Sequence, residues 1–238
     1  MLVSIVVPFY NEAGNVEALH RQITEVVGSL PGHTFEFLYV NDGSTDTTRD
    51  LINRVASADD RVRAIHLRRN SGQSGAVYSG LTASLGEYIL TLDGDLQNDP
   101  VDIPAFIELL HDYDCVCGYR ENRNDSAWRR TGSRIANRVR NAVLRDGVRD
   151  SACGAKGFRR SCIPHLVPFN GLHRFMPALL LTAGMSVTEY PVRHHPRRHG
   201  KSKYRTRDRF WRGIYDLIGV MWWRRRYVHP VPESDPED

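Results

Sequence analysis

The first 118 residues alternate short apolar runs with segments of helical periodicity, and this alternation constrains the fold more than any other feature. The run Leu2–Pro8 is almost entirely apolar and rich in β-branched residues, which is typical of a strand buried on both faces. The pattern predicts further strands at 35–40, 62–67, 87–92 and 114–118, and helices at 15–30, 45–56, 74–85 and 102–111. Strands that alternate with helices form a mainly parallel sheet covered on both faces, so the predicted fold class is α/β.

The second half of the chain is more basic and less regular. It predicts a polar loop at 119–125, a basic helix at 128–144, a strand at 154–160, a helix at 172–183, a strand at 187–192, a basic loop at 194–205 and a helix at 209–226. We expect one domain over residues 1–226, divided into 1–118, 119–205 and 206–226. Three prolines and four acidic residues then predict a disordered acidic tail at 227–238.

The net charge of +4 conceals an acidic half and a basic half. Residues 1–118 hold 7 Lys and Arg against 17 Asp and Glu, a net charge of −10, and residues 119–238 hold 25 against 11, a net charge of +14. The division suggests two functions on one chain and argues against a protein that coats nucleic acid.

No apolar run reaches the ~18 residues that span a bilayer, and Met1–Phe9 lacks the basic region of a signal peptide, so we expect a cytoplasmic protein. The cysteines at 115, 117, 153 and 162 lack CxxC spacing and are expected to be reduced, packed thiols.

The segment Asp93–Gln97 follows a predicted strand and carries two carboxylates separated by one glycine. Ligands of parallel sheets bind at the carboxyl ends of the strands. Two adjacent carboxylates repel each other unless a cation or hydrogen-bond donors offset their charge. The oxygens of Asp93 and Asp95 suit Mg²⁺ or Mn²⁺, which also bind diphosphates, and Gln97 adds a neutral oxygen. The alternative is a solvated turn, since Asp and Gly favour turns.

Polar residues also follow the first two predicted strands. Tyr10 and Glu12 come after the first, and Asp42 and Asp46 after the second, so all four are expected at the same edge of the sheet. Their oxygens can accept hydrogen bonds from a nucleobase or from ribose hydroxyls. The alternative is an ordinary helix start, in which Ser44 or Asp46 caps the next helix.

Four motifs occur in a fixed order: Pro-Phe-Tyr-Asn-Glu at 8–12, Asn-Asp-Gly-Ser-Thr-Asp at 41–46, Arg-Asn-Ser-Gly-Gln at 69–73 and Asp-Gly-Asp-Leu-Gln at 93–97. Together they resemble family 2 glycosyltransferases of the GT-A fold, and more closely the dolichol-phosphate and undecaprenyl-phosphate sugar transferases. The second half resembles the same group at 118–120, 129–134, 150–154, 173–175 and 200–204. The resemblance covers about residues 1–226. It implies an inverting, metal-dependent transfer of a sugar from a nucleotide-sugar to a polyprenyl phosphate.

The resemblance also implies roles for individual residues. The nucleotide-sugar would be bound by Pro8, Tyr10, Glu12, Asp42, Asp93, Arg197, Ser202 and Lys203. Mg²⁺ or Mn²⁺ would be bound by Asp93, Asp95 and Gln97. The acceptor phosphate would be bound by Arg120, Arg129, Ser133 and Arg134, and the catalytic residues would be Asp95, Arg120, Arg129 and Ser133. The family often has two aspartates in the second motif, where this chain has Asn41 and Asp42.

Chemical reasoning agrees with these roles. Negative charge builds on the leaving diphosphate, and a divalent cation with Arg or Lys donors stabilises it. The attacking phosphate monoester has a second pKa near ~6, so much of it is a dianion at neutral pH and needs no general base. Binding it calls for arginine forks, and residues 119–160 supply 12 Arg and Lys against 4 Asp and Glu. Of these, Arg138, Arg140 and Arg145 are expected on a solvated helix face.

Aromatic and apolar residues recur at helical spacing through 210–226, and the segment ends in Arg224–Arg226. Such a helix suits the membrane surface, which would place the protein at the cytoplasmic face of the membrane as a peripheral protein. The alternative is a helix that packs on the domain or in a dimer interface. A homodimer or higher oligomer also stays open.

Two other functions stay open. Transfer to a hydroxyl on a glycan or small molecule would need a general base, and His173 or Asp150 could serve, although each also suits a structural role. A catalytically inactive binding or regulatory protein on the same fold is disfavoured by the intact Asp93, Asp95 and Lys203. No nucleic-acid partner is expected, because the chain lacks an aromatic RNA-binding signature.

Overall fold

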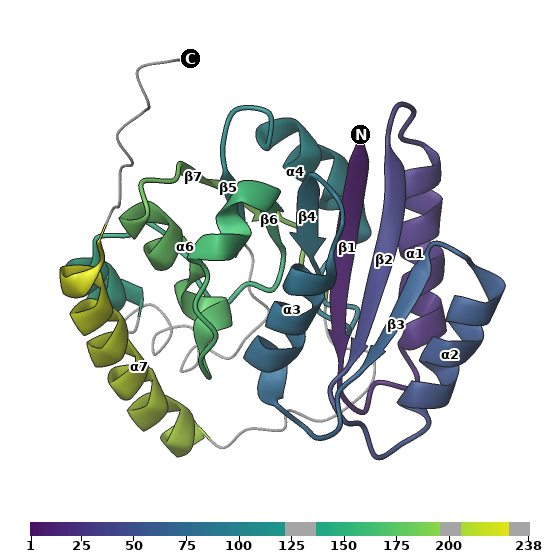
Figure 1. Ribbon diagram of the computed structural model, residues 1–238, viewed down its shortest axis with the longest axis horizontal. Coiled ribbons are helices and arrows are strands. Elements are labelled where there is room, and N and C mark those ends of the chain that lie inside the picture. The colour runs from purple at the N-terminus through teal and green to yellow at the C-terminus, as the bar shows by residue number, and fades with distance from the viewer. Residues whose placement is uncertain (122–136, 196–205, 229–238) are drawn as a thin grey trace, which may run out of the picture.

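The computed structural model describes residues 1–121, 137–195 and 206–228, with side chains from residue 212 onward in the last range. Within these ranges, one sheet has the strand order β3-β2-β1-β4-β6-β5-β7 (Figure 1). The strands are β1 (Leu2–Phe9), β2 (Thr34–Asn41), β3 (Val62–His66), β4 (Tyr88–Thr91), β5 (Cys115–Arg120), β6 (Lys156–Arg159) and β7 (Val187–Val192). Neighbouring strands are parallel except that β6 runs antiparallel to β4 and β5. The predicted α/β class is confirmed.

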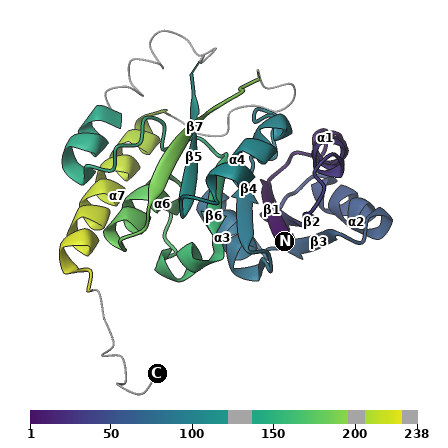
Figure 2. The ribbon, with the colours of Figure 1, turned by 90° about the horizontal axis from the view of Figure 1, so that it is seen from above.

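Helices cover both faces of the sheet. They are α1 (Val16–Gly28), α2 (Thr48–Ala58), α3 (Gly72–Ala83), α4 (Ile103–Leu109), α6 (Leu172–Thr182) and α7 (Thr206–Arg226), with short 3₁₀ turns η1 (Pro100–Asp102) and η2 (Arg160–His165). One apolar core is formed with α1, α2 and α4, and a second with α3, α6 and α7. Figure 2 shows α3 and α4 on opposite sides of the sheet. In α1 the buried residues Val16, Leu19, Ile23 and Val27 recur at the spacing of one helical face.

Most boundaries lie within a few residues of the sequence prediction, and two of the differences have a clear structural cause. Helix α2 begins at Thr48 rather than at residue 45, because Asp46 Oδ1 accepts hydrogen bonds from the Thr48 amide and hydroxyl at 3.0 and 2.5 Å. Strand β5 continues through Tyr119 and Arg120, where the polar composition predicts a loop. It continues because β7 pairs with it as far as Arg120.

All four cysteines are buried and free, as the sequence predicts. Cys115 and Cys117 lie on the same face of β5, with their sulfur atoms 3.8 Å apart. Burial raises the pKa of the Cys153 thiol to about 11 and that of Cys162 to about 12. These thiols are therefore protonated packing groups at neutral pH.

Helix α7 has a protein-facing side and an exposed side. Val220 is buried, and Leu217 and Trp223 pack against the same apolar core as α6. In contrast, Tyr215, Ile218 and Trp222 are exposed. No helix in the described part of the chain is long and apolar enough to cross a membrane. The predicted packing of this helix on the domain is thus observed, and an exposed apolar face remains.

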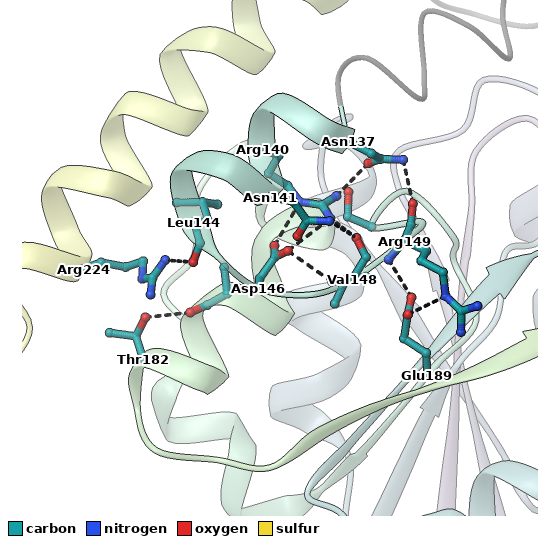
Figure 3. A network of polar contacts seen from close by, with 12 residues as sticks. Asn137, Arg140, Asn141, Leu144, Asp146, Val148, Arg149, Thr182, Glu189 and Arg224 are labelled. Carbon is teal, nitrogen blue, oxygen red and sulfur yellow. Dashed lines mark hydrogen bonds and ion pairs between the residues drawn. The ribbon is translucent and has the colours of Figure 1, made fainter.

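A short helix over residues 137–144, the described part of the predicted basic helix, buries Arg140, which corrects the prediction of a solvated face. Arg138 and Arg145 are exposed, but Arg140 is buried. Its Nε and Nη2 donate to Asp146 at 2.9 and 3.2 Å, and its Nη1 donates to Asn137 Oδ1 at 2.8 Å (Figure 3). The three arginines look alike in the sequence. Arg140 is buried because the chain folds back at 145–148 and places Asp146 against it.

We expect the substitution Arg140→Met to lower the free energy of unfolding by about 3–5 kcal/mol, because it leaves the Asp146 carboxylate buried without its cation. Arg138→Met on the same helix is the matched control and should change it by less than about 0.5 kcal/mol. Urea unfolding followed by circular dichroism measures both. Equal effects of the two substitutions would contradict the structural role of Arg140.

Candidate active site

Three polar segments meet at the carboxyl edge of the sheet. Strand β1 lies between β2 and β4, with Phe9 opposite Asn41 and Val6 opposite Thr91. The Asp42 amide then donates to the Phe9 carbonyl at 2.8 Å. The segments 10–12, 42–46 and 93–97 therefore emerge from neighbouring strands at one edge, where ligands of parallel sheets bind.

Asp42 is buried and held by the loop before α3. Its carboxylate accepts hydrogen bonds from the Ser71 amide at 2.6 Å and from Asn70 Nδ2 at 3.0 Å. Burial raises the pKa of Asp42, and the backbone hydrogen bonds only partly offset this effect. The loop approaches closely because residue 43 is glycine with φ +66°: a Cβ there would lie 2.6 Å from the Arg69 carbonyl carbon. The carboxylate orientation is thus fixed by the fold.

The neighbouring polar side chains close the turns after β1 and β2. Asn41 Oδ1 accepts from the Ser44 amide at 3.0 Å, and Asn11 Oδ1 accepts from the Thr45 amide at 2.8 Å. Glu12 accepts a hydrogen bond from the buried Asn15 at 2.6 Å. The amide at position 41 therefore has a structural contact in this chain, where the family often has a carboxylate.

The Asp93–Gln97 segment forms a hydrogen-bonded turn after β4. Asp93 Oδ1 accepts from Gln73 Nε2 at 2.7 Å, and Asp95 Oδ1 accepts from the Gln97 amide at 3.2 Å. Between the last two residues, Leu96 has a left-handed backbone with φ +60°. A Cβ built on Gly154 would lie 2.1–2.3 Å from the Asp93 carboxylate atoms, so Gly154 leaves room for this carboxylate.

The donor chemistry of this turn fits a divalent cation. Asp93 and Asp95 offer hard carboxylate oxygens, and Gln97 offers an amide oxygen, the ligand types that Mg²⁺ and Mn²⁺ prefer. The described residues contain no group of three or more His, Cys, Asp and Glu suited to a metal. A pair of carboxylates fits an ion that shares its remaining positions with water and phosphate oxygens.

A small pocket adjoins Asp93 and is lined by Gln73, Val77, Thr91, Leu92, Asp93, Cys153, Gly154, Lys156, His173 and Met176. The Lys156 ammonium is buried there and donates to the Ser151 carbonyl at 3.2 Å and to the Cys153 carbonyl. His173 Nδ1 lies 2.7 Å from Ser74 Oγ. Lys156 is not among the predicted site residues, and the signal for it in the sequence is a lysine between Ala155 and Gly157 in the strand predicted at 154–160.

Arg120 forms a forked ion pair with Asp150. Its Nε and Nη2 donate to the two carboxylate oxygens at 2.6 and 3.0 Å. Burial alone would lower the pKa of Arg120, but the hydrogen bonds and charge of Asp150, with a contribution from Asp93, raise it. Arg120 therefore remains a cation at the edge where Asp93 lies.

The chain after β7 is tied to the Asp93–Gln97 turn. The His195 amide donates to the Gln97 carbonyl at 2.9 Å, and Asn98 and His194 form a β-bridge. His194 and His195 are the first two residues of the basic loop predicted at 194–205. The predicted site residues Arg129, Ser133, Arg134, Arg197, Ser202 and Lys203 lie outside the described residues. The structure thus brings together Pro8, Tyr10, Glu12, Asp42, Asp93, Asp95, Gln97 and Arg120 from the predicted set.

Residues 4–166 match the family described as Glycosyl transferase family 2. The chain belongs to this family. It is 36% identical to a dodecaprenyl-phosphate galacturonate synthase of Rhizobium johnstonii over 96% of this chain and 69% of that protein. It is also 36% identical to an undecaprenyl-phosphate 4-deoxy-4-formamido-L-arabinose transferase of Pseudomonas paraeruginosa over 92% of this chain and 65% of that protein. The chain thus spans about two thirds of the length of these relatives.

Solved structures with the same fold include glucosyl-3-phosphoglycerate synthase from Mycobacterium tuberculosis. The complex with phosphoglyceric acid matches with a TM-score of 0.69 and 19% identity over 98% of this chain and 81% of that chain. A complex of the same enzyme with Mn²⁺, uridine-diphosphate and phosphoglyceric acid matches with a TM-score of 0.67 and 19% identity over 98% of this chain and 80% of that chain. The predicted GT-A fold of the family 2 chain is confirmed.

The substitution Gly154→Ala tests whether the close approach of Gly154 to the Asp93 carboxylate is needed for metal binding. The added methyl forces the carboxylate to move, so we expect the affinity for Mn²⁺ to fall about tenfold or more. Gly28→Ala, where a Cβ meets no atom within 4 Å, is the control. Electron paramagnetic resonance of free Mn²⁺ gives both affinities, and equal values would contradict the predicted contact.

Proposed function

We propose that this chain transfers a sugar from a nucleotide-sugar to a polyprenyl phosphate, with inversion at the anomeric carbon. The observation that carries the proposal is the meeting of Asp42, the Asp93/Asp95 pair and the Arg120 cation at one edge of the sheet. Support comes from the 36% identity to relatives named for dodecaprenyl-phosphate and undecaprenyl-phosphate substrates.

The acidic half of the site receives the donor. Pro8, Tyr10, Glu12 and Asp42 bind the nucleotide. The Asp42 carboxylate is already oriented by Ser71 and Asn70, so little reorganisation is needed when the donor arrives.

Asp93, Asp95 and Gln97 would hold Mg²⁺ or Mn²⁺, which supplies positive charge to the leaving diphosphate. We propose that Arg197, Ser202 and Lys203, in the loop after the His195–Gln97 contact, close over the same diphosphate.

The basic half receives the acceptor. Arg120, Arg129, Ser133 and Arg134 bind the phosphate of the lipid. A phosphate oxygen attacks the anomeric carbon, the new carbon–oxygen bond forms as the bond to the diphosphate breaks, and the electron pair leaves with the diphosphate. Because the attacking phosphate is anionic at neutral pH, no protein side chain has to remove a proton.

The two candidate bases for a hydroxyl acceptor have structural partners. Asp150 is 5% exposed and accepts both donors of the Arg120 fork, and His173 contacts Ser74 beside the small pocket at Asp93. These contacts favour the structural roles of Asp150 and His173, and with them an acceptor that needs no base.

We further propose that the exposed side of α7 lies on the cytoplasmic face of the membrane. Tyr215, Ile218 and Trp222 occupy one stripe of the helix, and the exposed Arg225 and Arg226 follow it. Aromatic and aliphatic side chains enter the headgroup region while arginines attract anionic lipids. This surface would hold the protein where polyprenyl phosphate is embedded.

A panel of nucleotide-sugars with Mn²⁺ and undecaprenyl phosphate tests the proposed reaction. At least one donor should give a lipid-linked sugar with the unaltered protein. Asp95→Ala removes a metal ligand and Arg129→Ala removes an acceptor contact, so each should reduce the rate at least about a hundredfold. Chromatography of radiolabelled lipid product measures the rate. Full activity of Asp95→Ala would contradict the metal assignment, and product without lipid would contradict the acceptor.

Sedimentation with phosphatidylglycerol vesicles tests the membrane surface. We expect binding that decreases as salt increases, because the attraction of Arg225 and Arg226 to anionic lipid is screened. The combined variant with Trp222, Arg225 and Arg226 replaced by alanine should lose most binding. Leu85→Ala, at another exposed apolar residue, is the control and should bind like the unaltered protein. Unchanged binding of the triple variant would exclude α7 as the membrane contact.

A further inference from the structure

The segment 70–74, which spans the end of the loop before α3 and the start of that helix, contacts two carboxylates of the proposed site and a neighbouring helix. Asn70 and Ser71 donate to the Asp42 carboxylate at 3.0 and 2.6 Å. Two residues later, Gln73 Nε2 donates to Asp93 Oδ1 at 2.7 Å. One short segment therefore touches both the nucleotide end and the metal end of the proposed site.

We propose that Gln73 is a positioning residue that orients the Asp93 carboxylate for metal binding. The inference rests on the proposed function, in which Asp93 is a metal ligand. Position 73 is outside the set of residues to which the family resemblance assigns a role.

The chemistry of the contact suits this role. A neutral amide donates one hydrogen bond to Asp93 Oδ1 and leaves the negative charge of the carboxylate in place. A lysine or arginine at position 73 would form an ion pair that competes with the metal cation. Gly154 lies against the same carboxylate, so the amide and the glycine backbone together limit its rotation. Donors that orient a metal ligand from outside typically change metal affinity by about 10–100-fold.

The turn that carries Gln73 is itself fixed. Gly72 has φ +77°, which starts the helix from a left-handed residue. The next side chain, Ser74, is buried and accepts from the Gly171 amide at 2.9 Å, and its hydroxyl oxygen lies 2.7 Å from His173 Nδ1. Contacts to Asp42 on one side of Gln73 and to Gly171 on the other thus fix the backbone at Gln73. Its side-chain amide is therefore positioned beside Asp93.

The test compares three variants by direct metal binding. Gln73→Met keeps the length of the side chain and removes both hydrogen-bonding groups, and Gln73→Ala removes the side chain. Thr82→Ala on the same helix is the control, because Thr82 is exposed and its hydroxyl bonds to carbonyls of α3. Binding of Mn²⁺ alone is followed by electron paramagnetic resonance, and thermal unfolding is recorded without metal.

Both Gln73 variants should raise the apparent Kd for Mn²⁺ by about 10–100-fold, whereas Thr82→Ala should leave it unchanged. Turnover should fall at low Mn²⁺ and recover toward that of the unaltered protein at saturating Mn²⁺. A merely structural role predicts a lower unfolding temperature with unchanged Mn²⁺ affinity, or a loss of turnover that excess Mn²⁺ does not restore. Either result would overturn the proposal.

The unaltered protein separates this inference from the proposed function. If it forms lipid-linked sugar in a Mn²⁺-dependent manner and Gln73→Met binds Mn²⁺ equally well, the function stands and the role of Gln73 is wrong. If the unaltered protein does not bind Mn²⁺, the metal assignment of Asp93 is wrong, and the role of Gln73 is wrong with it.

Discussion

The parallel pairing of β1 with β2 on one side and β4 on the other is the constraint on which the rest of the structure depends. It brings the carboxyl ends of three strands to one edge, so the acidic segments that follow them must share a small volume. Helix α3 can approach this edge because Gly80 has no side chain: a Cβ there would lie 2.3 Å from Val6 Cγ1. This tight packing of α3 on β1 fixes the position of the start of the helix relative to the carboxylates.

Carboxylates crowded at one edge need donors, and the fold supplies them from different elements. The loop before α3 donates hydrogen bonds to Asp42, and α3 itself donates one to Asp93. Strand β5 donates to Asp150 through the Arg120 side chain. At the opposite edge, the pKa of Glu36 is lowered. Burial alone would raise it, but hydrogen bonds from Ser4, Leu85 and Arg63 outweigh the effect of burial. Hydrogen bonds and ion pairs thus compensate buried carboxylates at both edges. Among the described residues, those at the carboxyl edge belong to the family motifs.

The order of the elements in the first half could be predicted because local patterns determine it. The burial of β1 and the periodicity of α1 are both visible in the sequence, and the motifs lie at the predicted strand ends. Contacts between distant segments were not predictable in this way. Arg140 differs from Arg138 only through its contact with Asp146, which forms when the chain folds back. The burial of Lys156 likewise depends on carbonyls of a neighbouring loop. The contact of Gln73 with Asp93 joins residues 20 positions apart.

The buried cysteines have a practical consequence. A thiol reacts as its thiolate, and burial both raises the thiol pKa and blocks access, so Cys115, Cys153 and Cys162 resist alkylating reagents in the folded protein. Cys117 is enclosed beside Cys115. A cysteine introduced at an exposed position such as Tyr215 would therefore take up a fluorescent or spin label selectively, with the native cysteines left in place.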